Sequence, residues 1–158
     1  MNREEKVTKV LNNFLESQGY SEDVVAKFIN ISDSYYAPGI IGEVVLGGIT
    51  NKAADEVFLR YCKELGLNIE VSVETLSFLH ELGHHNTMDF LDDDEILESE
   101  LTKLMLYMQD EESEENFIKY FNCPIEREAT IDAIEFCNHC STAAIQLDKE
   151  IQGALYER

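Results

Sequence analysis

The sequence predicts an α+β fold that is mostly helical, formed by one domain over residues 1–158. Apolar residues recur at intervals of three and four along most of the chain, which is typical of amphipathic helices. Residues 38–50 differ, because β-branched and apolar side chains there are punctuated by glycines. The chain has only two prolines and no repeat or linker, and a hydrophobic fraction of 44% suffices for one buried core.

The N-terminal third is expected to form two helices followed by the start of a small sheet. The first helix is indicated by Val7, Val10, Leu11, Phe14 and Leu15. Ser21 can cap a second helix over residues 22–31. Residues 38–50 then predict a hairpin or an edge strand.

The middle of the chain is expected to hold three helices and one short strand. The first of these helices is marked by Ala54, Val57, Phe58, Tyr61, Cys62 and Leu65. Gly66 ends it, and the alternation over residues 68–73 predicts a strand. A further helix should run over residues 73–88, and the acidic residues 92–94 should cap the next one. The buried stripe of that helix is expected to be Leu97, Leu101, Leu104, Met105 and Met108.

The C-terminal third is expected to be entirely helical. A second acidic break, residues 110–115, precedes a short helix that carries Phe117, Tyr120 and Phe121. Pro124 is placed where a helix tolerates proline best, in its first turn. One long helix should follow nearly to the C-terminus, with an apolar stripe of Ala133, Cys137, Cys140, Ala144, Leu147, Ile151 and Leu155.

The charge of the chain restricts its partners. With 32 acidic and 12 basic side chains the formal net charge is −20, which disfavours direct binding to nucleic acids and to anionic membranes. The chain shows neither a signal peptide nor a run of about 20 apolar residues, so a cytoplasmic location is expected. Its four cysteines are then expected to be reduced thiols.

The segment HELGHH, residues 80–85, predicts a metal site. His80 and His84 are four residues apart, so on a helix both imidazoles project from one face and can bind one zinc ion. Glu81 lies about 100° further around the helix, where it can act as general base towards a zinc-bound water. Gly83 indicates that another helix or a substrate strand approaches closely. His85 points away and is left off the ligand set.

A catalytic zinc usually takes a third protein ligand, and the last helix offers two candidates. Glu126 is in line with the apolar stripe, where a carboxylate is costly to bury unless a positive group meets it. Glu128 falls on the opposite side. Glu126 is therefore the preferred ligand, while Glu128, or a plain helix-dipole role for Glu126, stays open.

HELGHH followed by EREATIDA, residues 126–133, resembles the HExxH and ExxA signatures of zincin metallopeptidases, particularly the ImmA/IrrE-like family. The resemblance covers about residues 73–138. It implies a zincin-like domain with its small sheet beside the HExxH helix, zinc held by His80, His84 and Glu126, and catalysis by Glu81. It further implies peptide-bond hydrolysis in a protein substrate, such as a bacterial or phage regulatory protein. The chain departs from the family at Thr130, where Asn or Asp is common.

The sequence leaves the oxyanion-stabilising residue and the alternative function open. The candidates for stabilising a transition-state oxyanion are Tyr35, Tyr36, Tyr107, Tyr120 and His139. Residues 42–49 are the candidate edge strand for a peptide substrate. Cys137 and Cys140 have CxxC spacing but no second pair to complete a thiolate site. The alternative function is a non-catalytic acidic binding protein, or nucleic-acid mimic, that occupies a basic partner.

Overall fold

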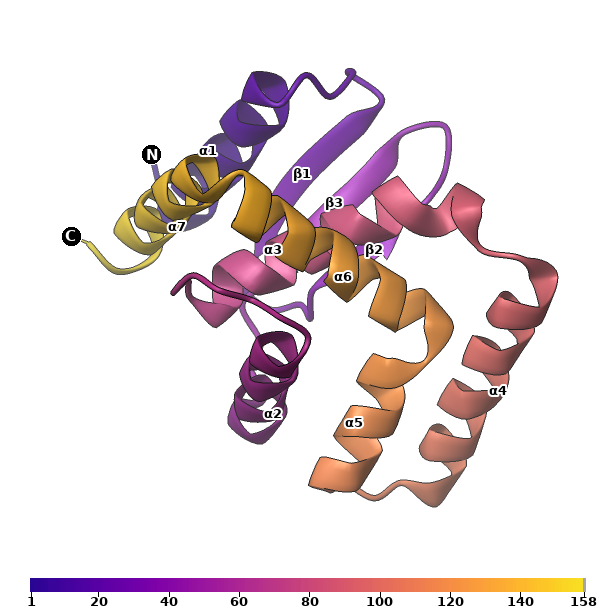
Figure 1. The fold of residues 1–158 in the computed structure, drawn as a ribbon. Helices are drawn as coiled ribbons and strands as arrows, with labels where there is room; N and C mark the ends of the chain where they lie inside the picture. Colours follow the sequence, from indigo (N-terminus) through magenta and orange to yellow (C-terminus); the bar gives the residue numbers. More distant parts are fainter. Residues whose placement is uncertain (158) are drawn as a thin grey trace.

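The computed structural model describes residues 1–157, and they form a mostly helical α+β fold with one small sheet (Figure 1). The helices are α1 (Arg3–Ser17), α2 (Lys52–Glu64), α3 (Val73–Thr87), α4 (Asp93–Gln109), α5 (Glu114–Asn122), α6 (Pro124–His139) and α7 (Ser141–Tyr156), with a 3-10 turn η1 (Met88–Phe90). The strands are β1 (Val24–Ile29), β2 (Tyr35–Ala37) and β3 (Gly42–Gly47). This confirms the predicted fold class. Within the described residues, no helix combines the length and the apolar character that crossing a bilayer requires.

The sheet has the strand order β1-β3-β2. β3 runs parallel to β1 and antiparallel to β2. Of the predicted segment 38–50, only β3 is a strand, and its hairpin partner β2 precedes that segment. The prediction that residues 42–49 form an edge strand was wrong, because β3 is the central strand and is paired on both sides. Its consecutive buried residues Val44, Val45 and Leu46 explain this, since such a run is typical of a strand covered on both faces.

The prediction of a helix over residues 22–31 was also wrong, because β1 occupies most of that segment. Val24, Ala26 and Phe28 are buried and the residues between them are more exposed, which is the two-residue period of a strand. Val24, Val25, Phe28 and Ile29 also fit a helical spacing over so short a stretch, so the apolar pattern alone could not separate a strand from a helix.

The outer edge of β1 is occupied by side chains of α1. Asn12 bonds both backbone groups of Ala26, with its Nδ2 donating to the carbonyl at 2.8 Å and its Oδ1 accepting from the N–H at 3.0 Å. The hydroxyl of Thr8 accepts from the N–H of Phe28 at 3.0 Å. An added strand would have to displace these bonds. In the described residues β2 pairs only with β3, so β2 provides the unprotected edge of the sheet.

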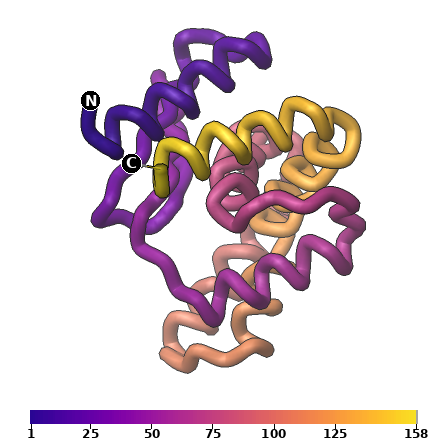
Figure 2. The backbone as a smooth tube through the Cα atoms, turned by 90° about the vertical axis from the view of Figure 1, so that its left-hand side faces the viewer, coloured from indigo at the N-terminus to yellow at the C-terminus, as the bar shows by residue number. Residues whose placement is uncertain are grey.

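The α3 helix is central to the molecule. It packs against β3 and β2 on one side and α6 on another, while α1 and α7 lie side by side over the rest of the core (Figures 1 and 2). The α4 and α5 helices form a pair at the end of the molecule away from α1 in both views. The sheet therefore lies beside the HELGHH helix, and the insert between HELGHH and Glu126 lies at the periphery.

Polar side chains begin most of the helices. In each of five helices an Asn, Ser or Asp residue accepts a bond from a backbone N–H of the first turn: Asn2, Asn51, Ser72, Asp92 and Ser113. Asp92 and Glu95 complete a reciprocal capping box, which confirms the predicted start of α4.

Two predicted elements near the C-terminal half are corrected. Residues 68–73 form no strand, because their backbone is bonded to side chains: Asn138 accepts from the N–H of Asn68, and Asp148 accepts from that of Ser72. The single last helix is two helices that meet at Cys140, whose ψ of 47° breaks the helical path. Cys140 is exposed as a result, while Cys137 and the rest of the predicted stripe are buried.

The predicted buried stripe of α4 is exposed. Leu97, Leu101, Leu104, Met105 and Met108 are 56%, 51%, 53%, 61% and 75% exposed. Ser99 is the buried residue of α4, and its hydroxyl accepts from the backbone N–H of Ile125 at 2.9 Å. Periodicity correctly predicted a helix there but assigned its two faces the wrong way round.

Candidate metal centre

The α3 helix presents His80, Glu81 and His84 as a compact group. Their potential ligand atoms all lie within 4.8 Å of one another, and the two imidazole rings are 4.7 Å apart between centroids. Ser72 caps the helix two turns earlier, so the i, i+4 pair is held on a regular α-helix as the spacing predicts. His80 is buried and its ring also contacts Phe58 edge-on, which fixes its orientation.

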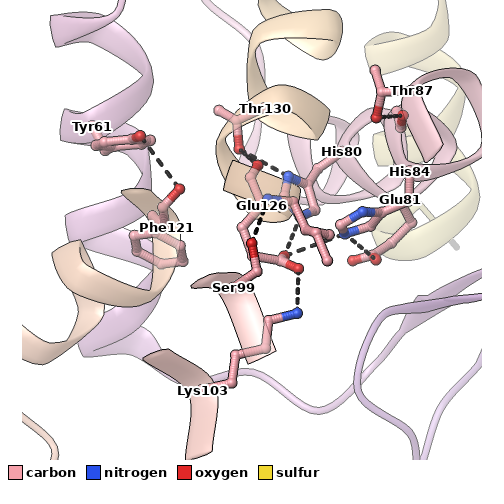
Figure 3. Close-up of polar contacts among 12 residues, drawn as sticks. Tyr61, His80, Glu81, His84, Thr87, Ser99, Lys103, Phe121, Glu126 and Thr130 are labelled. Carbon is pink, nitrogen blue, oxygen red and sulfur yellow. Dashed lines mark hydrogen bonds and ion pairs between the residues drawn. The ribbon is translucent and has the colours of Figure 1, made fainter. Parts of the chain in front are cut away.

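Glu126, from the first turn of α6, completes the cluster (Figure 3). Its Oε1 is 2.9 Å from Nε2 of His80 and 3.2 Å from Nε2 of His84. The residue is 4% exposed. Glu128 lies elsewhere, beside Thr87 in a separate surface cleft. The structure thus brings Glu126, and not Glu128, to the two histidines.

The distances from Glu126 Oε1 to the two histidine nitrogens are close to those of a zinc site. Zinc binds histidine nitrogen and carboxylate oxygen at roughly 2.0 to 2.2 Å, so the ligands of a tetrahedral site are about 3.3 to 3.5 Å apart. The two distances from Glu126 Oε1 to the histidine nitrogens approach that edge length. Two imidazoles and one carboxylate are also a donor set of catalytic zinc. His80, His84 and Glu126 are therefore the residues that would hold the metal.

Lys103 is a member of the cluster that the sequence did not predict. It extends from α4, and its Nζ donates to Glu126 Oε2 at 2.8 Å, which leaves Oε1 turned towards the histidines (Figure 3). Burial alone would raise the pKa of Glu126, but its hydrogen bonds with His80 and His84 outweigh burial and hold the pKa far below the usual range. The carboxylate is therefore ionised and available as a ligand.

Thr130 orients His80 from the opposite side. Its hydroxyl donates to the backbone carbonyl of Glu126 at 3.0 Å, so at the 2.9 Å contact with His80 it must accept from Nδ1–H. With Nδ1–H bonded to Thr130, Nε2, which donates to Glu126 in the metal-free protein, is the nitrogen that would lose its proton and bind a metal. The residue at which the chain departs from the family pattern thus has a defined structural role.

Replacing Thr130 with valine should weaken zinc binding about 10- to 100-fold, the usual cost of removing a group that orients a histidine ligand. Valine keeps the shape of threonine but cannot accept from Nδ1–H. The dissociation constant can be measured by competition with a chromophoric chelator. Thr130→Ser is the matched variant and should bind as the wild type does. Equal affinity of the valine variant would mean that the hydroxyl does not set the tautomer.

Glu81 lies at the open side of the cluster, with Oε1 3.7 Å from Nε2 of His84. Burial raises its pKa above the usual value, although the neighbouring His80 and His84 act in the opposite direction. Two clefts, of about 340 and 300 Å³, meet at Glu81, Glu126 and Tyr120. A carboxylate with a raised proton affinity therefore faces solvent-accessible space beside the candidate ligands.

Two of the predicted oxyanion candidates are excluded by position, since Tyr107 is 83% exposed and His139 lies at the far end of α6. Tyr35, Tyr36 and Tyr120 all line the clefts. The hydroxyl of Tyr36 is 2.8 Å from Nδ1 of His85. This contact explains where His85 points: it supports a cleft residue and lies outside the proposed ligand set, as predicted.

Gly83 lets α6 cross close to α3. A Cβ at this position would overlap the backbone carbonyl of Ala129, so the predicted close approach of another helix is present. The crossing brings the first turn of α6 over the histidines, which is how Glu126 reaches them.

Replacing Gly83 with alanine should therefore lower the free energy of unfolding by about 1 to 3 kcal/mol. The clash is with backbone and should exceed the gain of roughly 1 kcal/mol in helix propensity. Urea denaturation measures the effect. Gly153→Ala in α7 is the control, because a Cβ there meets only the flexible end of Glu157 and should stabilise. A stable Gly83→Ala protein would contradict the tight crossing.

The cysteines form no second centre. Cys137 is buried, Cys140 is exposed, and all four cysteines are free. Burial raises the pKa of Cys137 to about 12, which makes it a poor nucleophile and a poor metal ligand. The CxxC pair therefore forms no metal or redox site.

No protein-family model matches the chain, and no similar protein is found among curated proteins or among solved structures.

Proposed function

We propose that the protein is a zinc-dependent metallopeptidase that hydrolyses a peptide bond in a protein substrate. The observation that carries this proposal is the convergence of His80, His84 and Glu126, with Glu126 Oε1 2.9 and 3.2 Å from the two histidine nitrogens, at clefts that Glu81 also lines. The HExxH and ExxA signatures support the same assignment through their resemblance to the ImmA/IrrE-like family.

Different residues serve metal binding and proton transfer. Zinc, when bound, would lower the pKa of a water to about 7. Glu81 accepts the proton of the attacking water and returns it to the leaving amine. His80, His84 and Glu126 would hold the metal, and Thr130 and Lys103 orient two of these three side chains. A cleft tyrosine, Tyr36 or Tyr120, stabilises the charge that develops on the carbonyl oxygen.

The shape of the site favours a polypeptide substrate. The two clefts share Ser34, Glu81 and Glu126, so an extended chain can pass across the cluster with residues on both sides of the cleaved bond. Tyr35 and Tyr36 of β2 line one cleft, and β2 carries the unprotected edge of the sheet. Substrate addition to β2 therefore replaces the expected addition to residues 42–49, whose strand is already paired on both sides. We propose a cytoplasmic regulatory protein as the substrate class.

The first experiment is metal content of the purified, tag-free protein by mass spectrometry, together with the double variant His80→Ala, His84→Ala. About one zinc per chain is expected for the wild type and none for the variant, because the variant loses two of three ligands. Circular dichroism confirms that the variant is folded. A folded wild type that neither contains nor takes up zinc would rule out the proposed function.

A further inference from the structure

The exposed face of α4 is an apolar stripe with acidic borders. Leu97, Leu101, Leu104 and Met108 follow one another at intervals of four, three and four residues, which is the spacing of a helix seam that packs against another helix. All four are more than half exposed. Such a row on a solvent-facing helix marks an interaction surface rather than a core.

The borders of the stripe are carboxylates on both sides. At 100° per residue, Asp93 and Glu100 fall along one border and Asp94 and Glu98 along the other. All four are exposed. Lys103 is the one basic residue of α4, and it turns away from the stripe to contact Glu126. The exposed face of α4 therefore presents apolar and negatively charged groups but no positive one.

We propose that this face of α4, Leu97, Leu101, Leu104 and Met108 with their acidic borders, binds a cationic amphipathic helix of a partner protein. An amphipathic helix would bury its apolar side on the stripe, and lysines or arginines along its edges would meet the four carboxylates. A second copy of this chain fits less well, because it brings the same acidic borders and a net charge of −20.

The surface is separate from the metal centre. The stripe and Lys103 lie on different sides of α4, and α4 is attached to α6 through Ser99 and Lys103. A helix bound to the stripe would leave the clefts at Glu81 open. Binding should therefore be unchanged in the variant His80→Ala, His84→Ala, so this proposal and the proposed function can fail independently.

The probe is a labelled synthetic peptide of leucine and lysine with leucines at heptad spacing, and fluorescence anisotropy measures its affinity. A scrambled peptide of the same composition has the same charge but no apolar face, and should bind at least about tenfold more weakly. Leu101→Ser with Leu104→Ser should weaken binding of the amphipathic peptide by about tenfold or more. Ile31→Ser with Ile40→Ser is the control, since both isoleucines are exposed elsewhere.

Charge is tested by Glu98→Lys with Glu100→Lys, which should also weaken binding about tenfold. The control is Glu56→Lys with Glu64→Lys, two exposed residues of α2 that give the same change in net charge. If the two pairs of charge reversals weaken peptide binding equally, or if the scrambled peptide binds as tightly as the amphipathic one, the attraction is nonspecific and the proposal is overturned. Sedimentation showing a dimer that Leu101→Ser with Leu104→Ser dissociates would also overturn it, because a second copy would then cover the stripe.

Discussion

The variant Glu81→Gln should retain zinc and lose peptide cleavage by a factor of roughly 100 to 10,000. Glutamine keeps the size of the side chain but cannot accept the proton of the attacking water. Glu81 lies at the open side of the cluster, 3.7 Å from Nε2 of His84, and the proposed ligands do not include it. Cleavage can be followed by mass spectrometry with a proteome-derived peptide library and zinc-loaded protein.

Stability gives this variant a second readout. Burial raises the pKa of Glu81, so at a pH above that pKa the ionised carboxylate costs folding free energy that an uncharged amide does not. The melting temperature of Glu81→Gln should therefore equal or exceed that of the wild type. Undiminished cleavage in a folded, zinc-loaded variant would remove Glu81 from the proposed mechanism. If the chain instead acts only by occupying a basic partner, partner binding should survive the substitution.

Local signals in the sequence were sufficient for the parts of the fold that depend on near neighbours. The i, i+4 spacing of His80 and His84 fixes their relation on any helix, and Asp92 caps α4 as expected. The position of Glu126 on the apolar stripe of α6 also follows from one helix alone. These features could be predicted because a helix fixes the relative positions of residues that are only a few positions apart.

Features that depend on distant neighbours could not be predicted. Lys103 is the one basic residue of the acidic helix α4, and it contacts Glu126. Its role could not be predicted, because the sequence does not show that α4 packs beside α6. The faces of α4 were assigned wrongly because a repeat of apolar residues does not say whether they meet a core or solvent. The strand β1 was missed because Val24, Val25, Phe28 and Ile29 fit a helical spacing, and six residues are too few to distinguish it from the two-residue period of a strand.

The other large effect is expected for Glu126→Gln, which should weaken zinc binding by at least about 100-fold. Loss of an orienting group costs about 10- to 100-fold, and loss of a charged ligand should cost at least the upper end of that range. Glu128→Gln is the matched control two residues away, and it should bind zinc as the wild type does, because Glu128 lies beside Thr87 in a separate cleft.

Thermal denaturation with and without zinc provides an independent measure of the same pair of variants. Zinc at 1,000 times its dissociation constant stabilises a folded protein by about 4 kcal/mol, so a 100-fold weaker site at the same zinc concentration retains only about 1.4 kcal/mol. The zinc-induced rise in melting temperature should therefore shrink in Glu126→Gln and persist in Glu128→Gln. The opposite pattern would make Glu128 the ligand, and it would require α6 to rotate on α3 about the contact of Gly83 with Ala129. That contact is between backbones and leaves little room for such a rotation, which is why the geometry favours Glu126.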